Sequence, residues 1–156
     1  MQAWRIGKID DIDDFSGAGA ARFGGRWNHA EQPALYFGLS LTDCALDPII
    51  LAGHVPRLPL KLMLLHLPDD PALYQEPSVD RLPPGWDSLP ADKPSMDFGS
   101  RWLERAAHLG MILPSVVTGQ ARCLLINPRH AAVAQIRILQ VSDFIYGKPF
   151  SSGLTD

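Results

Sequence analysis

The sequence predicts a single α+β domain over residues 1–156, with a mixed or split β-sheet and flanking helices. Two observations predict this class: the expected strands outnumber the helices, and the two kinds of element interleave irregularly along the chain. A third is compositional. A hydrophobic content of 46% and a charged content of 20% are ordinary for a folded domain with its own core, and we find no internal repeat.

The first part of the chain predicts two short strands, at residues 2–6 and 33–37, separated by a long irregular stretch. That stretch begins with a cluster of aspartates and continues in small residues as far as Gly25. Neither feature has the periodicity of a helix or of a strand.

A helix is expected over residues 41–53, because Ser40 and Asp43 resemble a capping box at its start. Pro48 lies inside this helix. Proline removes a backbone donor and clashes with the preceding turn, so we expect a kink or an early end near Asp47.

A buried strand over 59–67 is followed by a proline-rich surface excursion at 68–94, which holds seven of the fourteen prolines. A loop of this length is commonly functional or mobile. The rest of the chain predicts a helix ended by Gly110, two strands at 111–117 and 122–126, a short helix after Pro128 and a last strand at 135–141. That helix has an apolar face made of Phe98, Trp102, Ala106 and Leu109.

Charge and composition exclude several classes of function. The net charge is −3 and no two Lys or Arg are adjacent, which argues against nucleic-acid binding. No apolar stretch is long enough to span a membrane, and the N-terminus lacks the order of a signal peptide, so we expect a cytoplasmic protein. The five histidines and two cysteines have no metal-ligand spacing, so no metal site is expected.

Two familiar motifs are also absent. Gly17-Ala18-Gly19 suggests a dinucleotide fingerprint, but its third glycine position is Arg22 and no apolar strand precedes it. The Gly-x-Ser-x-Gly elbow of serine hydrolases is missing from the sequence.

The most informative segment is Gly24-Gly25-Arg26-Trp27-Asn28, followed ten residues after Arg26 by Tyr36. Glycines allow the backbone to approach a ligand closely, and a guanidinium binds pairs of oxygens on a phosphate or a ribose. Asp47 and Ser115 complete the candidate set. Each of these residues also has a purely structural explanation. Arg26 could cap a carboxylate, and Tyr36 could be an ordinary core tyrosine. Asp47 could be a charge on a helix surface, and Ser115 an ordinary strand serine.

The ordered pattern resembles the RES-domain family, which is named for its Arg, Glu and Ser. The similarity extends over about residues 3–146. It rests on Trp4-Arg5, Phe23-Gly-Gly-Arg-Trp-Asn28, Pro33-Ala-Leu-Tyr36, Ser40 through Leu46, Trp102-Leu103, Pro114-Ser115, Leu124-Leu-Ile-Asn127-Pro128 and His130.

This resemblance implies a fold related to ADP-ribosyltransferases and the toxin half of a bacterial type II toxin–antitoxin pair. Members of the family consume NAD⁺, some with water or phosphate as acceptor and some by transferring ADP-ribose to a protein. The partner is typically a small helical antitoxin of the Xre-like class that blocks the pocket. Protein ADP-ribosylation is the function we expect, with NAD⁺ hydrolysis or phosphorolysis as the alternative.

The resemblance also assigns roles to residues. Arg26, Tyr36 and Ser115 match the family's functional positions, whereas Asp47 replaces the family's Glu and Cys123 stands where relatives often have Asn. The ribose becomes oxocarbenium-like as nicotinamide leaves, and a carboxylate at position 47 would stabilise that charge.

The remaining roles concern binding of the substrate. Arg26 would hold the pyrophosphate or the ribose oxygens, and Tyr36 would stack on the nicotinamide. Ser115 would make one hydrogen bond at the nicotinamide–ribose end. Trp27 would add an apolar wall, and weaker candidates for the binding of NAD⁺ are Asn28 and Asn127.

Asp47 is one methylene shorter than Glu, which leaves three outcomes open. In the first, the expected kink at Pro48 brings the Asp47 carboxylate forward and restores its position. In the second, hydrolysis by water is weak and a bound protein is the productive acceptor. In the third outcome the chain is an inactive relative that still binds an antitoxin.

Overall fold

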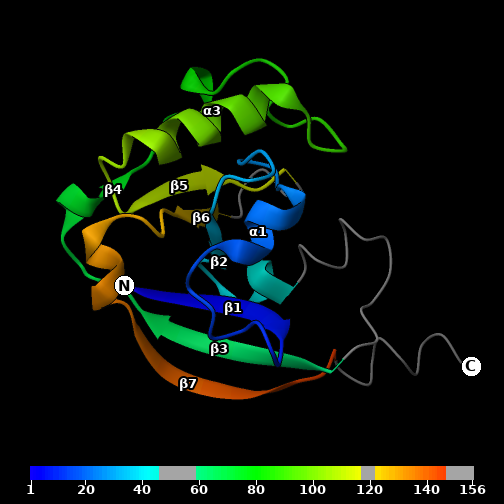
Figure 1. Ribbon diagram of the computed structural model, residues 1–156, viewed down its shortest axis with the longest axis vertical. Coiled ribbons are helices and arrows are strands. Elements are labelled where there is room, and N and C mark those ends of the chain that lie inside the picture. Colours follow the sequence, from blue (N-terminus) through cyan, green and yellow to red (C-terminus); the bar gives the residue numbers. More distant parts are fainter. Residues whose placement is uncertain (46–58, 117–121, 147–156) are drawn as a thin grey trace, which may run out of the picture.

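A mixed seven-stranded sheet forms the centre of the chain (Figure 1). This computed structural model describes residues 1–45, 59–116 and 122–146. Its strands are β1 (Gln2–Lys8), β2 (Leu35–Gly38), β3 (Leu60–His66), β4 (Tyr74–Gln75), β5 (Gly110–Pro114), β6 (Arg122–Ile126) and β7 (Arg137–Phe144). Their order across the sheet is β4-β5-β6-β2-β1-β3-β7.

The β4–β5 pair is parallel, and the other neighbouring pairs of this sheet are antiparallel. The helical elements described from end to end are α1 (Ala18–Phe23), α3 (Lys93–Arg105) and the 3₁₀ turns η1 (Pro71–Leu73), η2 (Val79–Arg81) and η3 (Ala131–Gln135), and residues 41–45 are helical as well. The predicted α+β class with a mixed sheet is therefore confirmed.

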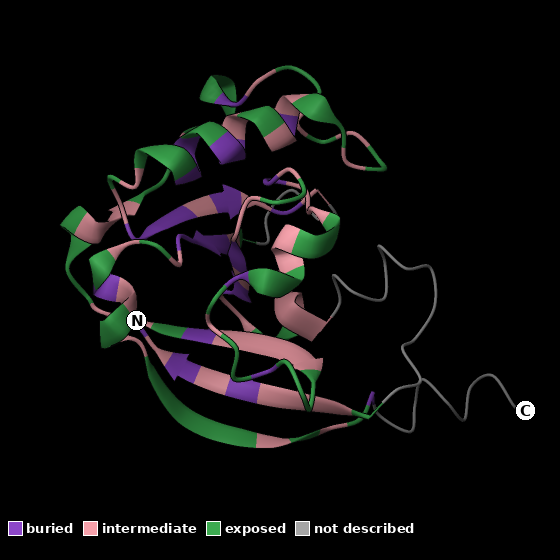
Figure 2. Cartoon of the chain, viewed as in Figure 1, coloured by how far each residue is buried: buried purple, intermediate pink, exposed green. Residues whose placement is uncertain are grey.

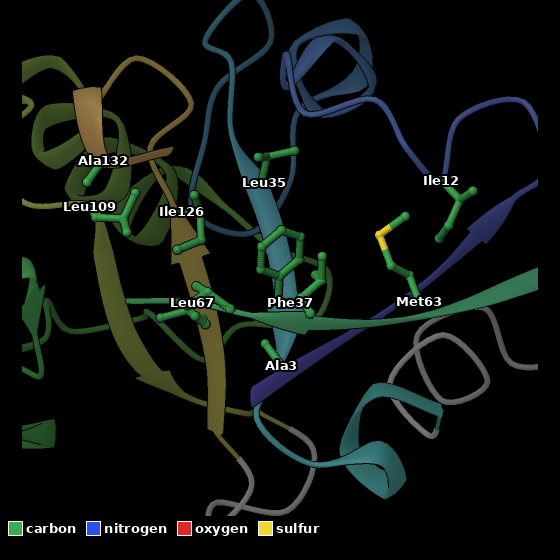
Figure 3. Packing of buried hydrophobic residues seen from close by; sticks show 11 residues of the cluster. Ala3, Ile12, Leu35, Phe37, Met63, Leu67, Leu109, Ile126 and Ala132 are labelled. Atoms are coloured by element: carbon green, nitrogen blue, oxygen red, sulfur yellow. The ribbon is translucent and has the colours of Figure 1, made fainter. Parts of the chain in front are cut away.

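Side chains on the two faces of the sheet enter two different cores. Leu35 and Phe37 of β2 point into a cluster with residues of β1, β3 and β6, seen from close by in Figure 3. Tyr36, between them, points the opposite way, because successive residues of a strand alternate between the two faces. On that second face Trp102 and Leu103 of α3 pack over β5 and β6, so the helix covers the sheet there (Figure 1).

The helix α3 begins where its sequence offers a cap. The Asp92 carboxylate accepts a hydrogen bond from the Lys93 N–H, and a proline occupies the first turn, where no helical donor is lost. The predicted end at Gly110 is wrong, since the helix ends at Arg105 and Gly110 begins β5. Leu109 continues the apolar spacing but is buried in the opposite cluster, so the chain turns through Ala106 at φ 51° to bring it there.

Other expectations differ in detail from the structure. The stretch before Gly25 contains the helix α1. The sequence did not predict this helix, because the small residues there show no apolar periodicity. The excursion at 68–94 includes β4, which adds an edge strand to the sheet. The helix expected after Pro128 is the 3₁₀ turn η3, and the last strand is shifted from 135–141 to Arg137–Phe144.

The expected helix over 41–53 is described only in its first turn, residues 41–45. Its predicted cap is present, because the Asp43 N–H donates to the Ser40 hydroxyl at 3.1 Å. Asp47 and Pro48 lie outside the described residues. In the part of the chain that is described, no helix has the length and apolar character needed to cross a bilayer.

Candidate functional site

The segment Gly25–Asn28 closes into a tight turn between α1 and β2. Gly25 and Asn28 form an isolated β-bridge, with the Gly25 N–H donating to the Asn28 carbonyl at 3.0 Å and the reverse bond at 3.4 Å. Arg26 and Trp27 occupy the two central positions. A closed turn of this kind holds the Arg26 backbone in one place.

The Tyr36 side chain fastens this turn to the sheet. Its hydroxyl accepts from the Trp27 N–H at 3.0 Å and donates to Asn28 Oδ1 at 2.6 Å. A Cβ on Gly25 would come within 2.9 Å of the same hydroxyl and 2.8 Å of Asn28 Oδ1. The space that the glycine leaves is therefore used by Tyr36 and Asn28, rather than by a ligand.

Trp27 and Asn28, which follow Arg26 in the turn, have extensive contacts of their own. Asn28 is fully buried, and its amide donates to the carbonyls of Ala20, His29 and Gln32. Trp27 is 1% exposed and stacks on Trp86, with ring centroids 6.2 Å apart and 17° between the planes. These contacts organise the turn, and a direct role for either residue in binding NAD⁺ stays a prediction.

Arg26 extends from this turn to a loop sixty residues further along the chain. Its Nη1 donates to the carbonyl of Trp86 at 3.0 Å and to that of Ser88 at 2.8 Å. The other three N–H groups, on Nη2 and Nε, have no hydrogen-bond partner among the described residues, where Arg26 also makes no salt bridge. One side of the guanidinium is thus fixed, and the other retains donors for an anionic oxygen.

Burial lowers the pKa of the Arg26 guanidinium from its ordinary value, while the charge of Asp87 acts in the opposite direction. Arginine nevertheless stays protonated in proteins. A partly desolvated cation with spare donors is suited to a phosphate or carboxylate group, because the surroundings screen the attraction less than bulk water does.

The loop that receives Arg26 is itself held in place. Trp86 stacks on the buried Trp27, and the Ser88 hydroxyl donates to the Gly85 carbonyl at 2.8 Å. Sequence reasoning missed this loop, since its contacts with Arg26 use backbone carbonyls. The one available signal was a tryptophan within a proline-rich segment, in Gly85-Trp86-Asp87-Ser88.

Cys123 lies close enough to Arg26 and Tyr36 to act electrostatically on the pKa of both side chains, in the upward direction. Burial raises the pKa of the Tyr36 hydroxyl, and the Cys123 thiol contributes to that increase. Cys123 is opposite Gly38 on β2 and opposite Leu113 on β5, and it packs at the margin of the core beneath α3. The structure therefore brings Cys123 into the neighbourhood of Arg26 and Tyr36.

Ser115 follows the last residue of β5 and is 6% exposed. Leu113, two residues earlier in the chain, points into the core beneath α3, in which Tyr36 also packs. Tyr36 and the turn that carries Arg26 lie on this side of the sheet, and the association of Ser115 with them stays a prediction.

Asn127 has a separate environment at the other end of β6. Its amide donates to the Leu103 carbonyl of α3 at 2.8 Å, and its Oδ1 accepts from the Arg129 N–H. The buried side chain joins the end of the helix to the loop after β6. A role in binding NAD⁺ stays a prediction. Across the described ranges, no group of three or more His, Cys, Asp or Glu could hold a metal ion.

Tyr36→Phe tests the contribution of the hydroxyl to the turn. The change leaves the Trp27 N–H without its acceptor, so we expect a loss of about 1–3 kcal/mol in the free energy of unfolding. Burial raises the pKa of Tyr36, so the unfolded chain loses this proton at a lower pH than the folded chain. The stabilisation from Tyr36 is thus complete below about pH 10 and lost as the pH rises above it.

Urea titrations at neutral and alkaline pH measure both effects. The variant should lose less stability than the parent between the two pH values. Equal losses of stability in the parent and the variant would show that Tyr36 does not contribute to the pH dependence. Burial also raises the pKa of Tyr74, to about 12, and this residue is present in both chains. Its contribution to the pH dependence is therefore the same in parent and variant, so the difference between them reports Tyr36.

The fold places this chain in a known structural class. It resembles a chain in the crystal structure of the M. tuberculosis MbcT–MbcA toxin–antitoxin complex, with a TM-score of 0.68 and 21% identity, over 92% of this chain and 83% of that one. The sequence matches the RES domain over residues 2–147, and the chain belongs to the RES domain family.

Curated relatives are named as toxins. The chain is 33% identical to a Prs ADP-ribosylating toxin of Sphingobium sp. strain YBL2, over 92% of each chain. It is 32% identical to Toxin Res of Yersinia enterocolitica, over 74% of this chain and 76% of the relative, and 31% identical to Toxin Res of Pseudomonas putida, over 92% and 95%.

Proposed function

We propose that this chain is the toxin of a toxin–antitoxin pair, that it binds NAD⁺ as substrate, and that it transfers ADP-ribose to a protein. The observation that supports this most directly is the Arg26 guanidinium, held on one side by two carbonyls and keeping donors on the other. The relative named a Prs ADP-ribosylating toxin, similar over 92% of both chains, supports the same reaction.

The chemistry requires little proton transfer, because nicotinamide leaves NAD⁺ as a neutral ring. The difficult step is the development of positive charge on the ribose as the glycosidic bond breaks. In this proposal Arg26 binds the pyrophosphate or ribose oxygens and fixes the dinucleotide, which lowers the entropic part of the barrier. Ser115 makes one hydrogen bond at the nicotinamide–ribose end, and Tyr36 packs against the ring.

The proposed carboxylate is that of Asp47, which would stabilise the developing charge on the ribose. Trp27 supplies apolar support, and Asn28 and Asn127 are assigned to the binding of NAD⁺ through the loops that they hold. The partner is a cognate antitoxin of the Xre-like class that blocks the site in the cytoplasm. A relative of the fold was solved in complex with its antitoxin, which supports such a partner.

A second reaction is compatible with the same residues. Water or phosphate in place of a protein would make the chain an NAD⁺ glycohydrolase or phosphorylase, because bond cleavage needs the same electrostatic stabilisation. The name of the Sphingobium relative favours a protein acceptor. An inactive relative that only binds an antitoxin is the third possibility, and it predicts no cleavage under any condition.

The test is the release of free nicotinamide from NAD⁺ by the purified chain in four conditions: buffer, phosphate, purified Prs, and cell lysate. A protein acceptor is expected to give release that increases with Prs or lysate, together with transfer of label from NAD⁺ to a protein band. Full release in buffer or phosphate would replace the proposal by hydrolysis or phosphorolysis. No release in any condition would support the inactive relative.

Trp86→Ala is expected to lower kcat/KM for NAD⁺ by about tenfold or more, since a displacement of about 1 Å at a positioning group costs up to about 10²-fold in rate. The reason is that Trp86 supplies one carbonyl to Arg26, while its ring, stacked on Trp27, holds the loop in place. The measurement is steady-state nicotinamide release at a temperature where the variant is folded.

Two variants control for this effect. Trp86→Phe retains an aromatic ring for the stack and should recover most of the activity. Leu89→Ala alters the same loop at a side chain that is 65% exposed, and should match the parent. If Trp86→Ala and Leu89→Ala have equal kinetics, Trp86 does not position Arg26.

A further inference from the structure

The two cysteines of the chain lie on the same face of the sheet, although they are far apart in the sequence. Cys123 lies on β6 directly opposite Gly38 of β2, and it packs against the cluster beneath α3. Gly38 follows Tyr36 by two residues on β2, so a side chain at position 38 would point to this same face. Cys44 belongs to the helical turn at residues 41–45, which Figure 2 shows as partly exposed below α1.

Cys44 occupies the space that a side chain at position 38 would need. A Cβ on Gly38 would lie 2.6 Å from Cys44 Cβ, 3.0 Å from its Cα and 3.1 Å from its backbone nitrogen. The Cys44 side chain therefore stands where a cross-strand neighbour of Cys123 would stand. Such neighbours have Cβ atoms about 4.5–5.5 Å apart and commonly interact.

The backbone brings the two cysteines close to the separation that a disulfide spans. Directly opposed residues of an antiparallel pair, such as Gly38 and Cys123, have Cα atoms about 4.5–5.5 Å apart. Because Cys44 stands over Gly38, the two cysteine Cα atoms are on the order of 6–7 Å apart, at the upper end of the range found in disulfides. A small approach of the helical turn to β6 is therefore sufficient for a bond.

The Cys44 thiol can change direction at low cost. Both cysteines are partly exposed thiols, which a small oxidant can reach. The Cys44 thiol donates to the Trp4 carbonyl at 3.4 Å, and Trp4 lies on β1, on the opposite side of β2 from Cys123. A thiol is a weak donor, so rotation about the Cα–Cβ bond exchanges a weak contact for the Cys123 sulfur.

We propose that Cys44 and Cys123 are an oxidation site, at which a peroxide converts the two thiols into an intramolecular disulfide across Gly38. Hydrogen peroxide oxidises one thiol sulfur to a sulfenic acid, and one water is released. The second thiol sulfur then attacks that sulfur, the S–S bond forms, and the hydroxyl leaves as a second water. Two electrons pass from the sulfurs to the peroxide, and a dithiol reductant reverses the bond. Exposed disulfides of this kind are typical of redox sensing.

The bond connects two parts of the candidate site. Cys123 lies in the neighbourhood of Arg26 and Tyr36, and Cys44 precedes Asp47 by three residues. Oxidation fixes the helical turn before Asp47 against β6, and we expect it to slow the cleavage of NAD⁺ by about tenfold, because small displacements of positioning groups have large effects on rate. This consequence rests on the proposed function, whereas the formation of the disulfide does not.

The first test identifies the bond by mass spectrometry. After treatment of the parent with a stoichiometric amount of hydrogen peroxide, the intact mass should fall by about 2 Da, because two hydrogens are lost. Digestion without reductant should give one joined pair of peptides that contains both cysteines, and dithiothreitol should separate it. Cys44→Ser and Cys123→Ser should not lose this mass. A parent that only gains oxygen, or that only cross-links between copies, overturns the proposal.

The second test moves the thiol away from Gly38. In the double variant Asp43→Cys/Cys44→Ser the thiol stays on the same helical turn but points about 100° away around the helix. We expect its disulfide with Cys123 to form at least about tenfold more slowly than the bond in the parent at equal oxidant, since ring closure depends on orientation. Circular dichroism confirms that the variant is folded. Equal rates would overturn the proposal, because the position over Gly38 would then not create the site.

The functional readout compares nicotinamide release from NAD⁺ by the reduced chain, by the purified disulfide form, and by the disulfide form after dithiothreitol. Slower release that dithiothreitol restores supports the expected control by oxidation, and equal release by the reduced and disulfide forms refutes it. No release by any form refutes the proposed function, and the mass measurement then still decides whether the disulfide forms.

Discussion

Nicotinamide release from NAD⁺ is expected to fall by about 10²–10³-fold in Arg26→Ala, while the chain keeps its fold. The loss should be this large because Arg26 is the cation that the turn and the 86–88 loop together hold in a fixed orientation. A preorganised cation needs no rearrangement when the substrate binds, so its full interaction is available to position NAD⁺.

The variant also leaves the carbonyls of Trp86 and Ser88 without their donor. These groups lie on a surface loop, where water can replace the guanidinium, so the cost in stability should be small compared with the cost in rate. Thermal unfolding of parent and variant separates the two effects.

Two further variants define the role of the guanidinium. Arg26→Lys keeps the charge but lacks the planar fork, so it should recover only part of the activity. Arg22→Ala removes an exposed arginine of the neighbouring helix, whose guanidinium lies 5.9 Å from the Phe23 ring, and should leave the rate unchanged. Arg26→Ala with activity within about threefold of the parent would refute the assignment of this residue.

Gly99→Ala is expected to destabilise the chain by about 3 kcal/mol or more, the largest effect on folding that a single methyl group should have here. A Cβ at this position would lie 1.9 Å from the Trp27 carbonyl oxygen and 2.7 Å from the Trp27 carbonyl carbon. The obstruction is backbone, so no rotation of a side chain relieves it. α3 and the Arg26 turn must therefore separate.

Within a helix the same substitution normally stabilises by about 0.5–1 kcal/mol, so the local preference and the tertiary contact predict opposite signs. Gly19→Ala is the matched control, since a Cβ there meets nothing within 4 Å and the residue lies in α1. Urea unfolding should show Gly19→Ala slightly more stable than the parent and Gly99→Ala much less stable. A stabilised Gly99→Ala would contradict the close approach of α3 to the turn.

Separation of α3 from the turn has a functional consequence as well. Gly99 contacts Trp27, the neighbour of Arg26, and the Ser100 hydroxyl accepts from the His29 N–H at 3.0 Å on the other side of the turn. We expect the folded fraction of Gly99→Ala to cleave NAD⁺ more slowly than the parent, because the turn that carries Arg26 is displaced.

The sequence alone was sufficient for the elements with strong local signals. The strand over residues 122–126 was predicted with its observed limits, because a run of buried apolar residues is a local property. The same is true of the Ser40 cap, which depends on residues three apart. The proximity of Tyr36 to the turn that carries Arg26 was also within reach, since a turn and the next strand are neighbours along the chain.

The first and last residues of α3 and β7 were harder to predict from the sequence. Leu109 repeats the helical spacing of apolar residues, although it is buried in the cluster on the opposite face of the sheet. Periodicity records that a residue is buried but does not record against which surface. The extent of β7 follows from its pairing with β3, a partner more than seventy residues away, and not from its own alternation, which a bulge interrupts.

What the sequence determined by itself was therefore the family, the class of fold and the arginine on its glycine turn. Only the tertiary structure decided what holds that arginine, because its partners are backbone carbonyls of Trp86 and Ser88 and every residue type has such a carbonyl. It also decided that Gly99 is required by a neighbouring backbone, and that β7 is left at the edge of the sheet. Contacts of this kind depend on the close packing of distant segments, which composition and spacing do not encode.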